Sequence, residues 1–275
     1  MTEKKPVIVV KYGGNAMTNE DLQRQVIQNI CMLQQEGYRV VIVHGGGPFI
    51  KQALFEAKVE SEFIDGHRVT TPEALLLVEK ALKGQVNGAL VKLVNQAGYR
   101  GVGLSGKDGK IAIAIKRIHR KEVNGLVEEH DLGRVGDVVE VNTGLLDVLL
   151  QNDYIPVLAC LAADTDSNEF NVNGDMFAGH IAGALRAEAL LILTDVDGLM
   201  MDKDDASSLI STLEMSEIEP LKDKQVIQGG MIPKTEACKV ALEKGAQSAV
   251  IINGTQPEQI LAFGKKESVG TVLLP

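Results

Sequence analysis

The stretch VVIVHGGGPFIKQAL, residues 40–54, runs from a short apolar segment through three consecutive glycines into a helical pattern. Its first four residues are apolar and mostly β-branched, which predicts a buried strand, and Pro48 suits the first turn of a helix. The glycines leave backbone N–H groups uncovered by any Cβ at the positive end of that helix. Such a turn predicts an anion site, although it matches neither G-x-G-x-x-G nor G-x-x-x-x-G-K-[ST].

Apolar strand patterns and helical patterns alternate along most of the chain. Strands are predicted at 7–10, 40–43, 101–104, 155–161, 189–194, 249–252 and 271–274, and helices at 18–36, 72–97, 142–151, 175–187, 232–244 and 257–263. The middle of the chain adds an irregular hairpin at 59–69, strands at 111–115 and 135–141, and a turn at Asn124-Gly125. This alternation predicts an α/β fold, a three-layer sandwich around a mostly parallel sheet with helices on both faces.

Two helix starts are suggested by side chains that cap helices. Thr18 with Asp21, and Thr70 with Glu73, have the spacing of a capping pair. No repeat, low-complexity tract or Pro/Ser-rich linker divides the chain. We therefore expect two lobes that meet near residue 175, and not two independently folding domains.

Composition excludes several classes of function. The net charge of −9, the 4% aromatic content and the absence of Trp argue against a nucleic-acid partner. Cys31, Cys160 and Cys238 lie far apart, so neither a disulfide framework nor a zinc site is expected. We found no signal-peptide pattern and no apolar run as long as a bilayer span, so we expect a soluble cytoplasmic protein without a membrane partner.

The segment GVGLSGKD, residues 101–108, matches two phosphate-binding patterns in part. Gly101, Gly103 and Gly106 satisfy G-x-G-x-x-G, and Gly106-Lys107 resembles the end of a P-loop. Both motifs need a helix directly after the glycines, because its N-terminus holds the phosphate. Here a turn and the strand pattern IAIAI follow. A strand–turn–strand is therefore the preferred interpretation, and a nicotinamide dehydrogenase would rest on this segment alone.

Small and charged residues gather where predicted strands end or predicted helices begin. The segments are Lys11 with Gly13-Gly14, Gly45–Gly47, Asn171–Asp175, Thr194–Gly198 and Gly229–Lys234. Parallel strands bring their carboxyl ends to one edge of a sheet, so these segments are expected to meet there. Each has an ordinary explanation by itself, such as a turn, a helix cap or a solvated lysine. Together they predict a site for an anionic ligand, with backbone N–H groups and two lysines.

In this order the segments resemble the N-acetylglutamate kinases of the amino acid kinase family. The matching motifs are KYGGNAM at 11, HGGGP at 44, GHRVT at 66, GLSGKDG at 103, NVNGD at 171, LTDVDG at 193 and GGMIPK at 229. The resemblance implies the amino acid kinase fold and phosphorylation of the side-chain carboxylate of N-acetyl-L-glutamate by ATP, a step of arginine biosynthesis. It further implies an N-terminal lobe, 1–174, for substrate and dimerisation, and a C-terminal lobe, 175–275, for the nucleotide.

The same resemblance assigns roles to individual residues. Lys11 and Lys234 would stabilise the transferring phosphoryl group, and Asp175 would hold both ammonium groups. The amino-acid substrate would contact Gly46, Gly47, Arg68 and Asn171. The nucleotide would contact Gly13, Gly14, Asp195, Gly198, Gly230 and Met231. Mg²⁺ would arrive with ATP, held by phosphates and water, with no dedicated metal site in the protein.

The sequence departs from the family pattern in three places. His67 stands where Leu is common, Cys160-Leu161 where Pro-Ile is common, and Gly174-Asp175-Met176 where Ala-Asp-Thr is common. These departures leave open a sister kinase that acts on N-succinylglutamate or an aminoadipate derivative. A non-catalytic sensor of nucleotide or amino acid is a further alternative, although Lys11, Asp175 and Lys234 are all present.

The resemblance also leads to predictions about regulation and assembly. Arginine-inhibited relatives carry an extra helix before the first strand, whereas Lys11 here is almost at the start. We therefore expect no strong feedback by arginine and a homodimer instead of a hexamer. The helix at 72–97, in which Gly84 and Gly88 would allow close approach, is either the dimer contact or interior core.

Overall fold

The computed structural model describes residues 5–123, 126–202 and 204–275. The turn predicted at Asn124-Gly125 lies outside the described residues. The helices are α1 (Glu20–Met32), α2 (Gly47–Glu56), α3 (Pro72–Glu79), α4 (Asn87–Gln96), α5 (Gly144–Gln151), α6 (Gly174–Ala184), α7 (Ile218–Asp223), α8 (Ile232–Glu243) and α9 (Glu258–Gly264). Among the described residues, no helix is long and apolar enough to cross a membrane.

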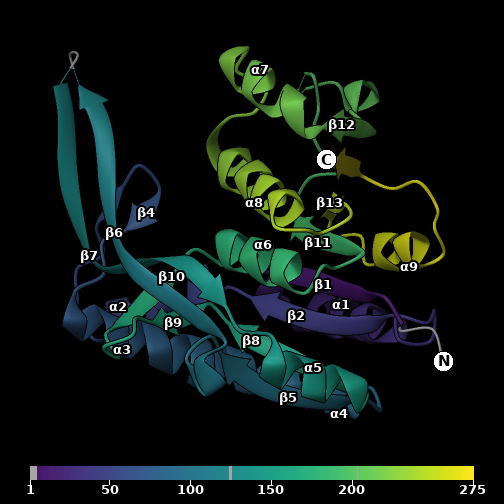
Figure 1. Cartoon of the computed structure of the whole chain (residues 1–275), viewed down its shortest axis with the longest axis horizontal. Helices are drawn as coiled ribbons and strands as arrows, with labels where there is room; N and C mark the ends of the chain where they lie inside the picture. The colour runs from purple at the N-terminus through teal and green to yellow at the C-terminus, as the bar shows by residue number, and fades with distance from the viewer. Residues whose placement is uncertain (1–4, 124–125, 203) are drawn as a thin grey trace.

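One eight-stranded sheet runs through the molecule (Figure 1). Its order is β12 (Thr212–Glu214), β14 (Thr271–Leu274), β13 (Ala249–Asn253), β11 (Ala189–Thr194), β1 (Val7–Tyr12), β2 (Arg39–His44), β8 (Tyr154–Ala159) and β5 (Arg100–Ser105). All neighbouring pairs are parallel except β13 with β14. The predicted mostly parallel α/β sheet is confirmed, and both predicted lobes contribute strands to it.

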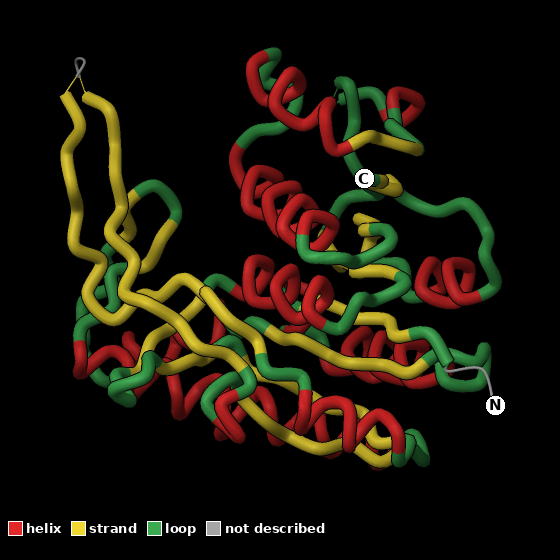
Figure 2. Tube along the Cα trace, viewed as in Figure 1, coloured by secondary structure: helices red, strands yellow, loops and turns green. Residues whose placement is uncertain are grey.

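Helices cover both faces of this sheet, as Figure 2 shows. Along β1, Val7 and Val9 join one buried cluster, whereas Ile8 and Val10 join another. The first cluster includes residues of α2, α3, α5, α6 and α8, and the second includes residues of α1, α4 and α9. A strand buried on both faces carries an uninterrupted apolar run, which is why VIVV and VVIV are readable in the sequence.

A second group of strands lies beside the carboxyl end of β2 and β8. It consists of β6 (Ala112–Val123), β7 (Leu126–Val141), β9 (Leu161–Ala163) and β10 (Glu169–Val172), which pair in the order β10-β7-β6-β9. The outer parts of β6 and β7 form a two-stranded ribbon that extends away from the body, with the short hairpin β3 (Phe63–Ile64) and β4 (His67–Arg68) next to it (Figure 1).

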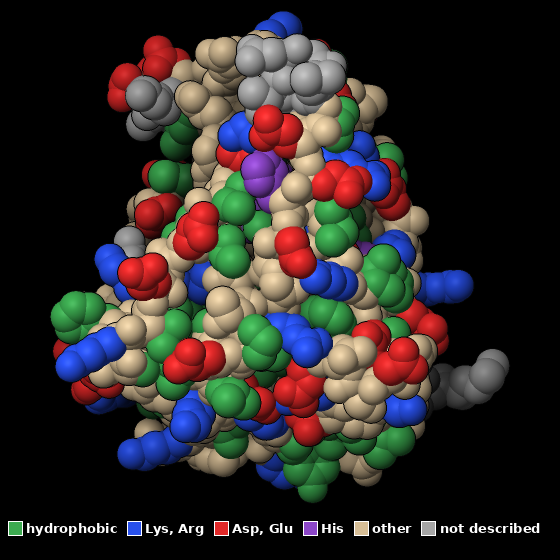
Figure 3. Space-filling view, turned by 90° about the vertical axis from the view of Figure 1, so that its left-hand side faces the viewer, with side chains coloured by type: hydrophobic (Ala, Val, Ile, Leu, Met, Phe, Trp, Pro, Cys, Tyr) green, Lys and Arg blue, Asp and Glu red, His purple; other side chains and the backbone are tan. Residues whose placement is uncertain are grey.

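The ribbon is held by ion pairs between its strands. Lys116 pairs with Asp131 and Arg120 with Glu129, so basic and acidic side chains alternate over this end of the molecule (Figure 3). The turn of the β3–β4 hairpin is attached to it, because Asp65 accepts hydrogen bonds from His119 and Lys121 at 2.8 Å each. Both signs of charge therefore lie side by side among the described residues of this ribbon.

Several predicted boundaries are wrong by one or more residues. Helix α1 is capped by Asn19 instead of Thr18, and α3 by Thr71 instead of Thr70. Strands β6 and β7 are much longer than the predicted 111–115 and 135–141, and β9, β10, β12 and α7 were not predicted. The helix predicted over 72–97 is one continuous rod, but a π-helical segment, Lys80–Val86, separates α3 from α4.

The segment at 101–108 forms a strand and a short turn. Gly101 and Gly103 lie in β5, and a 3₁₀ turn, Asp108–Lys110, leads into β6. No α-helix opens after these glycines in the described chain, so the two partial phosphate-binding patterns are not used. Lys107 instead forms ion pairs with Glu79 and Glu169, at 2.6 and 2.7 Å.

Helices α6 and α8 pack unusually closely because two glycines face the contact. A Cβ on Gly179 would lie 2.5 Å from the carbonyl oxygen of Ala237, and one on Gly183 would lie 2.4 Å from Cβ of Lys244. Asp175 and Lys234 lie in the first turns of these two helices. The close packing therefore sets the distance between an acidic and a basic side chain at their starts.

We predict that Gly179→Ala lowers the free energy of unfolding by about 1–2 kcal/mol. The overpacking cost lies in the upper part of the usual range of about 1–3 kcal/mol, because a backbone oxygen cannot easily move, and the helix-propensity gain of about 1 kcal/mol offsets only part of it. Urea denaturation followed by circular dichroism measures the change. The control is Glu243→Ala on the exposed side of α8, expected within about 0.5 kcal/mol of the wild type. A neutral or stabilising Gly179→Ala would contradict the packing argument.

Candidate active site

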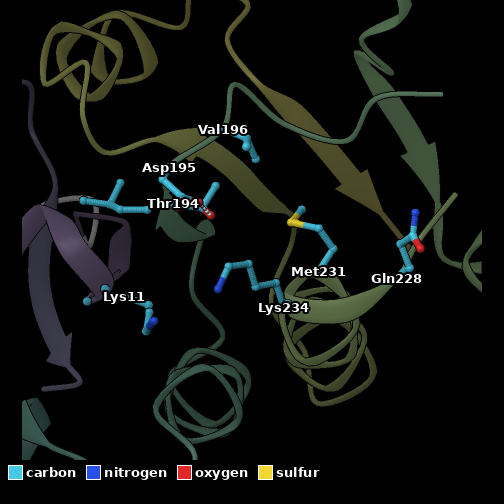
Figure 4. Close-up of a pocket in the computed structure, with 11 residues that line it drawn as sticks. Lys11, Thr194, Asp195, Val196, Gln228, Met231 and Lys234 are labelled. Atoms are coloured by element: carbon cyan, nitrogen blue, oxygen red, sulfur yellow. Dashed lines mark hydrogen bonds between the residues drawn. The ribbon is translucent and has the colours of Figure 1, made fainter. Parts of the chain in front are cut away.

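The segments singled out in the sequence meet at the carboxyl edge of the parallel strands. Lys11 lies near the end of β1, the glycine turn follows β2, and Thr194-Asp195 end β11. Asp175 and Lys234 come from the first turns of α6 and α8. Figure 4 shows Lys11 and Lys234 reaching toward the same space from opposite sides. The strand order, with β1 between β2 and β11, produces this convergence.

A buried carboxylate bridges the two lysines. Nζ of Lys11 lies 2.8 Å from Oδ1 of Asp175, and Nζ of Lys234 lies 3.3 Å from Oδ2. The side chains of Lys11 and Asp175 are each 9% exposed. Burial by itself would raise the pKa of Asp175, but the charges of Lys11 and Lys234 outweigh it, and the pKa falls below its ordinary value. The group therefore stays ionised, and its charge holds two cations side by side.

The backbone around Asp175 fixes where its carboxylate points. Asn173 caps α6, and its side-chain oxygen accepts the N–H groups of Asp175 and Met176 at 2.9 and 3.1 Å. The positive end of the helix further favours an anion in the first turn. Gly174 lies against Lys11, since a Cβ there would be 3.6 Å from Cε of Lys11. Asn173, and not Asp175, is therefore the residue of the segment Asn171–Asp175 that caps the helix.

A cavity of about 400 Å³ opens next to the two lysines. Its walls are Lys11, Gly13, Gly14, Leu193, Thr194, Asp195, Val196, Gln228, Gly230, Met231 and Lys234. Five of the six residues predicted for the nucleotide are therefore in one wall. Gly198 is not; a Cβ there would lie 2.6 Å from Oγ1 of Thr271, so this glycine serves close packing against β14.

The glycine turn lies directly beside this group. A Cβ on Gly13 would come 3.7 Å from the nitrogen of Gly45, and one on Gly174 would come 3.7 Å from Cα of Gly45. Gly46 is buried against Leu82, and Gly47 begins α2. Neither Gly46 nor Gly47 lines the cavity of about 400 Å³, and the turn meets the charged group through Gly45.

Two further cavities, of about 260 and 530 Å³, lie next to the β3–β4 hairpin. They share His67, Arg117, Asn173 and Met176, and the larger one shares Gly230 with the cavity of about 400 Å³. Arg117 donates to Asp137 at 2.7 Å, and its Nε is buried with no hydrogen-bond partner in the described structure. Burial lowers the pKa of His67, and that of His180 to about 4. His67, one of the departures from the family pattern, therefore faces a cavity.

The residues that line these cavities were largely missed in the sequence. Arg117 and Asp137 sit on β6 and β7, where charged residues alternate with apolar ones on a half-exposed ribbon. Asn173 and Met176 lie in or next to the motif NVNGD, but roles in the site were predicted only for Asn171 and Asp175 of that motif. The one available signal was the density of charged and polar residues in a segment with strand propensity.

Arg68 and Asn171, predicted to bind the α-carboxylate of the substrate, lie outside the walls of these cavities. Arg68 donates to the hydroxyl of Ser61, and its guanidinium lies 4.5 Å from the ring centre of Phe63. Asn171 lies in β10, between Val135 of β7 and Leu161 of β9. Neither belongs to the walls of the three cavities formed by the described residues.

Among the described residues, metal-binding side chains do not gather in this region. Within residues 5–123, 126–202 and 204–275, no group of three His, Cys, Asp or Glu side chains is arranged to hold a metal ion. Asp175 is the carboxylate nearest to the lysines, and both of its oxygens already face ammonium groups. Asp195 in the cavity wall is exposed and accepts from Thr194.

Comparisons with solved structures agree on the fold. The chain resembles smu.665 from Streptococcus mutans with a TM-score of 0.74 and 27% identity over 98% of both chains. It also resembles the carbamate kinase of Giardia lamblia, solved bound to AMP-PNP, with a TM-score of 0.68 and 16% identity over 98% of both chains. The second likeness shows the fold alone.

Comparisons with known sequences place the chain more closely. It is 43% identical to the acetylglutamate kinase of Methanococcus aeolicus over 97% of this chain and 91% of that protein. The model of the amino acid kinase family matches residues 6–253. Since that match covers nearly the whole sheet and every segment of the site, the chain belongs to the amino acid kinase family.

Proposed function

We propose that this protein transfers the γ-phosphoryl group of ATP to the side-chain carboxylate of N-acetyl-L-glutamate, a step of arginine biosynthesis. The product would be N-acetyl-L-glutamyl 5-phosphate. Relatives 40–43% identical over most of the chain bear the name acetylglutamate kinase, which favours the acetylated substrate over an N-succinyl or aminoadipate analogue. The observation that carries the proposal is the pair of ammonium groups that Asp175 holds together at the wall of the cavity of about 400 Å³.

The chemistry of the transfer needs cations more than it needs a base. The acceptor carboxylate is already ionised, so its oxygen forms a bond to the γ-phosphorus while the bond from that phosphorus to the β–γ bridging oxygen breaks. No proton has to move, and ADP leaves with the electron pair. The obstacle is repulsion between two anions, which Lys11 and Lys234 would offset from opposite sides of the transferring group. Asp175 would fix their separation.

The nucleotide would occupy the cavity of about 400 Å³. Gly13 and Gly14 have no side chains to block the approach of phosphates, and the lysines lie at one side of the cavity. Mg²⁺ bound with ATP would neutralise part of the phosphate charge. Because both oxygens of Asp175 are taken by lysines, phosphates and water are the ligands that we propose for the ion.

The amino acid would lie on the other side of the lysines, next to the glycine turn. We propose that Gly46 and Gly47 offer N–H groups to it and that Arg68 and Asn171 bind its α-carboxylate. Arg68 would have to leave Ser61 to do so. The N-terminal segment, 1–174, would then hold the acceptor and 175–275 most of the nucleotide. A cytoplasmic location, where ATP and amino-acid precursors meet, belongs to the same proposal.

The reaction is tested with hydroxylamine, which traps an acyl phosphate as a hydroxamate. Purified protein with Mg-ATP and N-acetyl-L-glutamate should form ADP and hydroxamate in equal amounts, and neither should form if one reactant is omitted. N-succinyl-L-glutamate, N-acetyl-L-aminoadipate and free glutamate serve as competing acceptors. Absence of hydroxamate with every acceptor would contradict the proposed reaction. A preference for a longer acceptor would show that this acceptor, and not N-acetyl-L-glutamate, is the substrate.

Lys234→Ala should lower kcat by about a hundredfold to a thousandfold, because it removes one charge from the transferring phosphoryl group. The KM for N-acetylglutamate should change by less than about threefold, since the lost contact is made mainly in the transition state. Steady-state kinetics measures both. Lys239→Ala on the same helix is the control, because Lys239 pairs only with Glu219 at 3.5 Å among the described residues. An unchanged kcat in Lys234→Ala would rule out the assigned role.

We also propose that the protein is a homodimer through the rod formed by α3, the π-helical segment and α4. Gly84 and Gly88 are both exposed and have no heavy atom within 4 Å of an added Cβ, whereas Leu82, Val86 and Leu90 of the same rod are buried. The glycine face is thus not interior core in a single chain. Two such faces without side chains would allow close approach of a second copy.

Gly88→Arg should convert a dimer into a monomer, since a long charged side chain would fill the proposed contact. Sedimentation velocity at micromolar concentration measures the mass of the particle. Glu243→Arg on the exposed side of α8 is the control and should leave the mass unchanged. A wild-type protein that sediments as a monomer, or a Gly88→Arg variant that remains a dimer, would overturn the proposed interface.

A further inference from the structure

His44 is the last residue of β2 and immediately precedes the glycine turn, and its side chain is completely buried. Nδ1 lies 2.9 Å from the carbonyl oxygen of Gly45, and Nε2 lies 2.9 Å from Nδ2 of Asn87. Burial lowers its pKa to about 4, so the ring is neutral near pH 7. A neutral imidazole carries one N–H, and one ring nitrogen must therefore accept while the other donates.

The amide of Asn87 decides which nitrogen carries the proton. Nδ2 of Asn87 lies 2.8 Å from the carbonyl oxygen of Val157 and, more weakly, 3.4 Å from that of Leu104, and a carbonyl oxygen can only accept a hydrogen bond. The amide nitrogen, and not the amide oxygen, must face these carbonyls. The same nitrogen faces Nε2 of His44, so Nε2 accepts. The proton is left on Nδ1, which donates to Gly45.

This hydrogen bond fixes a peptide plane at the edge of the active site. In a trans peptide the C=O and the following N–H point in opposite directions. With the Gly45 carbonyl held toward the ring, the N–H of Gly46 points away from it. Gly45 lies beside Gly13 and Gly174, because a Cβ added to either glycine would come 3.7 Å from a backbone atom of Gly45. As the N-cap of α2, Gly46 has no carbonyl within its own helix to receive this N–H.

The π-helical segment brings Asn87 and Leu82 to the same turn. The N–H of Asn87 binds the carbonyl oxygen of Leu82, five residues earlier, so both side chains lie on one face of the rod. Leu82 is fully buried against Gly46, where an added Cβ would come 2.6 Å from its Cδ2. In a regular α-helix a separation of five residues rotates the side chains by about 140°, and the two contacts would not be made together.

We propose that His44, held in its Nδ1–H tautomer by Asn87, is a positioning residue for phosphoryl transfer: it orients the Gly45–Gly46 peptide so that the Gly46 N–H faces the acceptor carboxylate. The inference rests on the proposed function, because it names the glycine turn as the acceptor side of the site. It adds a chain of contacts from the π-helical segment to the reacting group through Asn87, His44 and Gly45.

Two matched substitutions separate the donor on Nδ1 from the bulk of the ring. His44→Asn places an amide N–H where Nδ1 stands and keeps the donation to Gly45. His44→Gln places its amide near the position of Nε2 and loses that donation. We expect the KM for N-acetylglutamate to rise about tenfold in His44→Gln, the loss of one hydrogen bond, and less than about threefold in His44→Asn. The KM for ATP should stay within about twofold in both.

Equal increases in the KM for N-acetylglutamate in the two variants, or an increase in the KM for ATP, would overturn the proposal. The tautomer itself is measured in the wild-type protein by ¹⁵N NMR of labelled histidines at pH 7, which does not depend on activity or on folding of a variant. A proton on Nδ1 of His44 is expected, and a proton on Nε2 or a charged ring would overturn the inference. If the wild-type protein forms no hydroxamate, the proposed function fails, and the NMR result still decides the tautomer.

Discussion

The carboxylate of Asp175 is the charge on which the site depends. Two buried or nearly buried ammonium groups repel each other and lose hydration, and neither would remain beside the other without a fixed anion between them. With a net charge of −9, the rest of the protein does not attract a phosphate or a carboxylate. The affinity for two anionic reactants must therefore come from this local arrangement of one carboxylate and two ammonium groups.

Each part of the fold contributes one member of that arrangement. The parallel sheet delivers Lys11 at the end of β1 and the glycine turn at the end of β2. The close packing of α6 on α8, which Gly179 permits, sets Asp175 opposite Lys234. The π-helical segment presses a buried leucine and an asparagine against the glycine turn. Rigid elements thus place every group, and mobile loops are not needed to assemble the charges.

Much of the sheet and the charged centre could be predicted from the sequence. Strands buried on both faces, such as VIVV and VVIV, are uninterrupted apolar runs, and glycines and lysines at their ends mark the site. The ribbon was underestimated because β6 and β7 leave the core and carry charged residues, such as Arg117 and Asp137, instead of an uninterrupted apolar run. The π-helical segment has no separate sequence signature. Its consequence, that Asn87 meets His44, could be found only in three dimensions.

The central claim is that one carboxylate holds both lysines in place for phosphoryl transfer. The most direct test is the steady-state kcat of Asp175→Asn with both reactants saturating, together with the KM for each reactant, compared with the wild type. Asparagine keeps the shape but turns an amide N–H toward one lysine and removes the charge. A rate lower by about a hundredfold or more is expected, with both KM values changed by less than about fivefold. A rate within about threefold of the wild type would contradict the account.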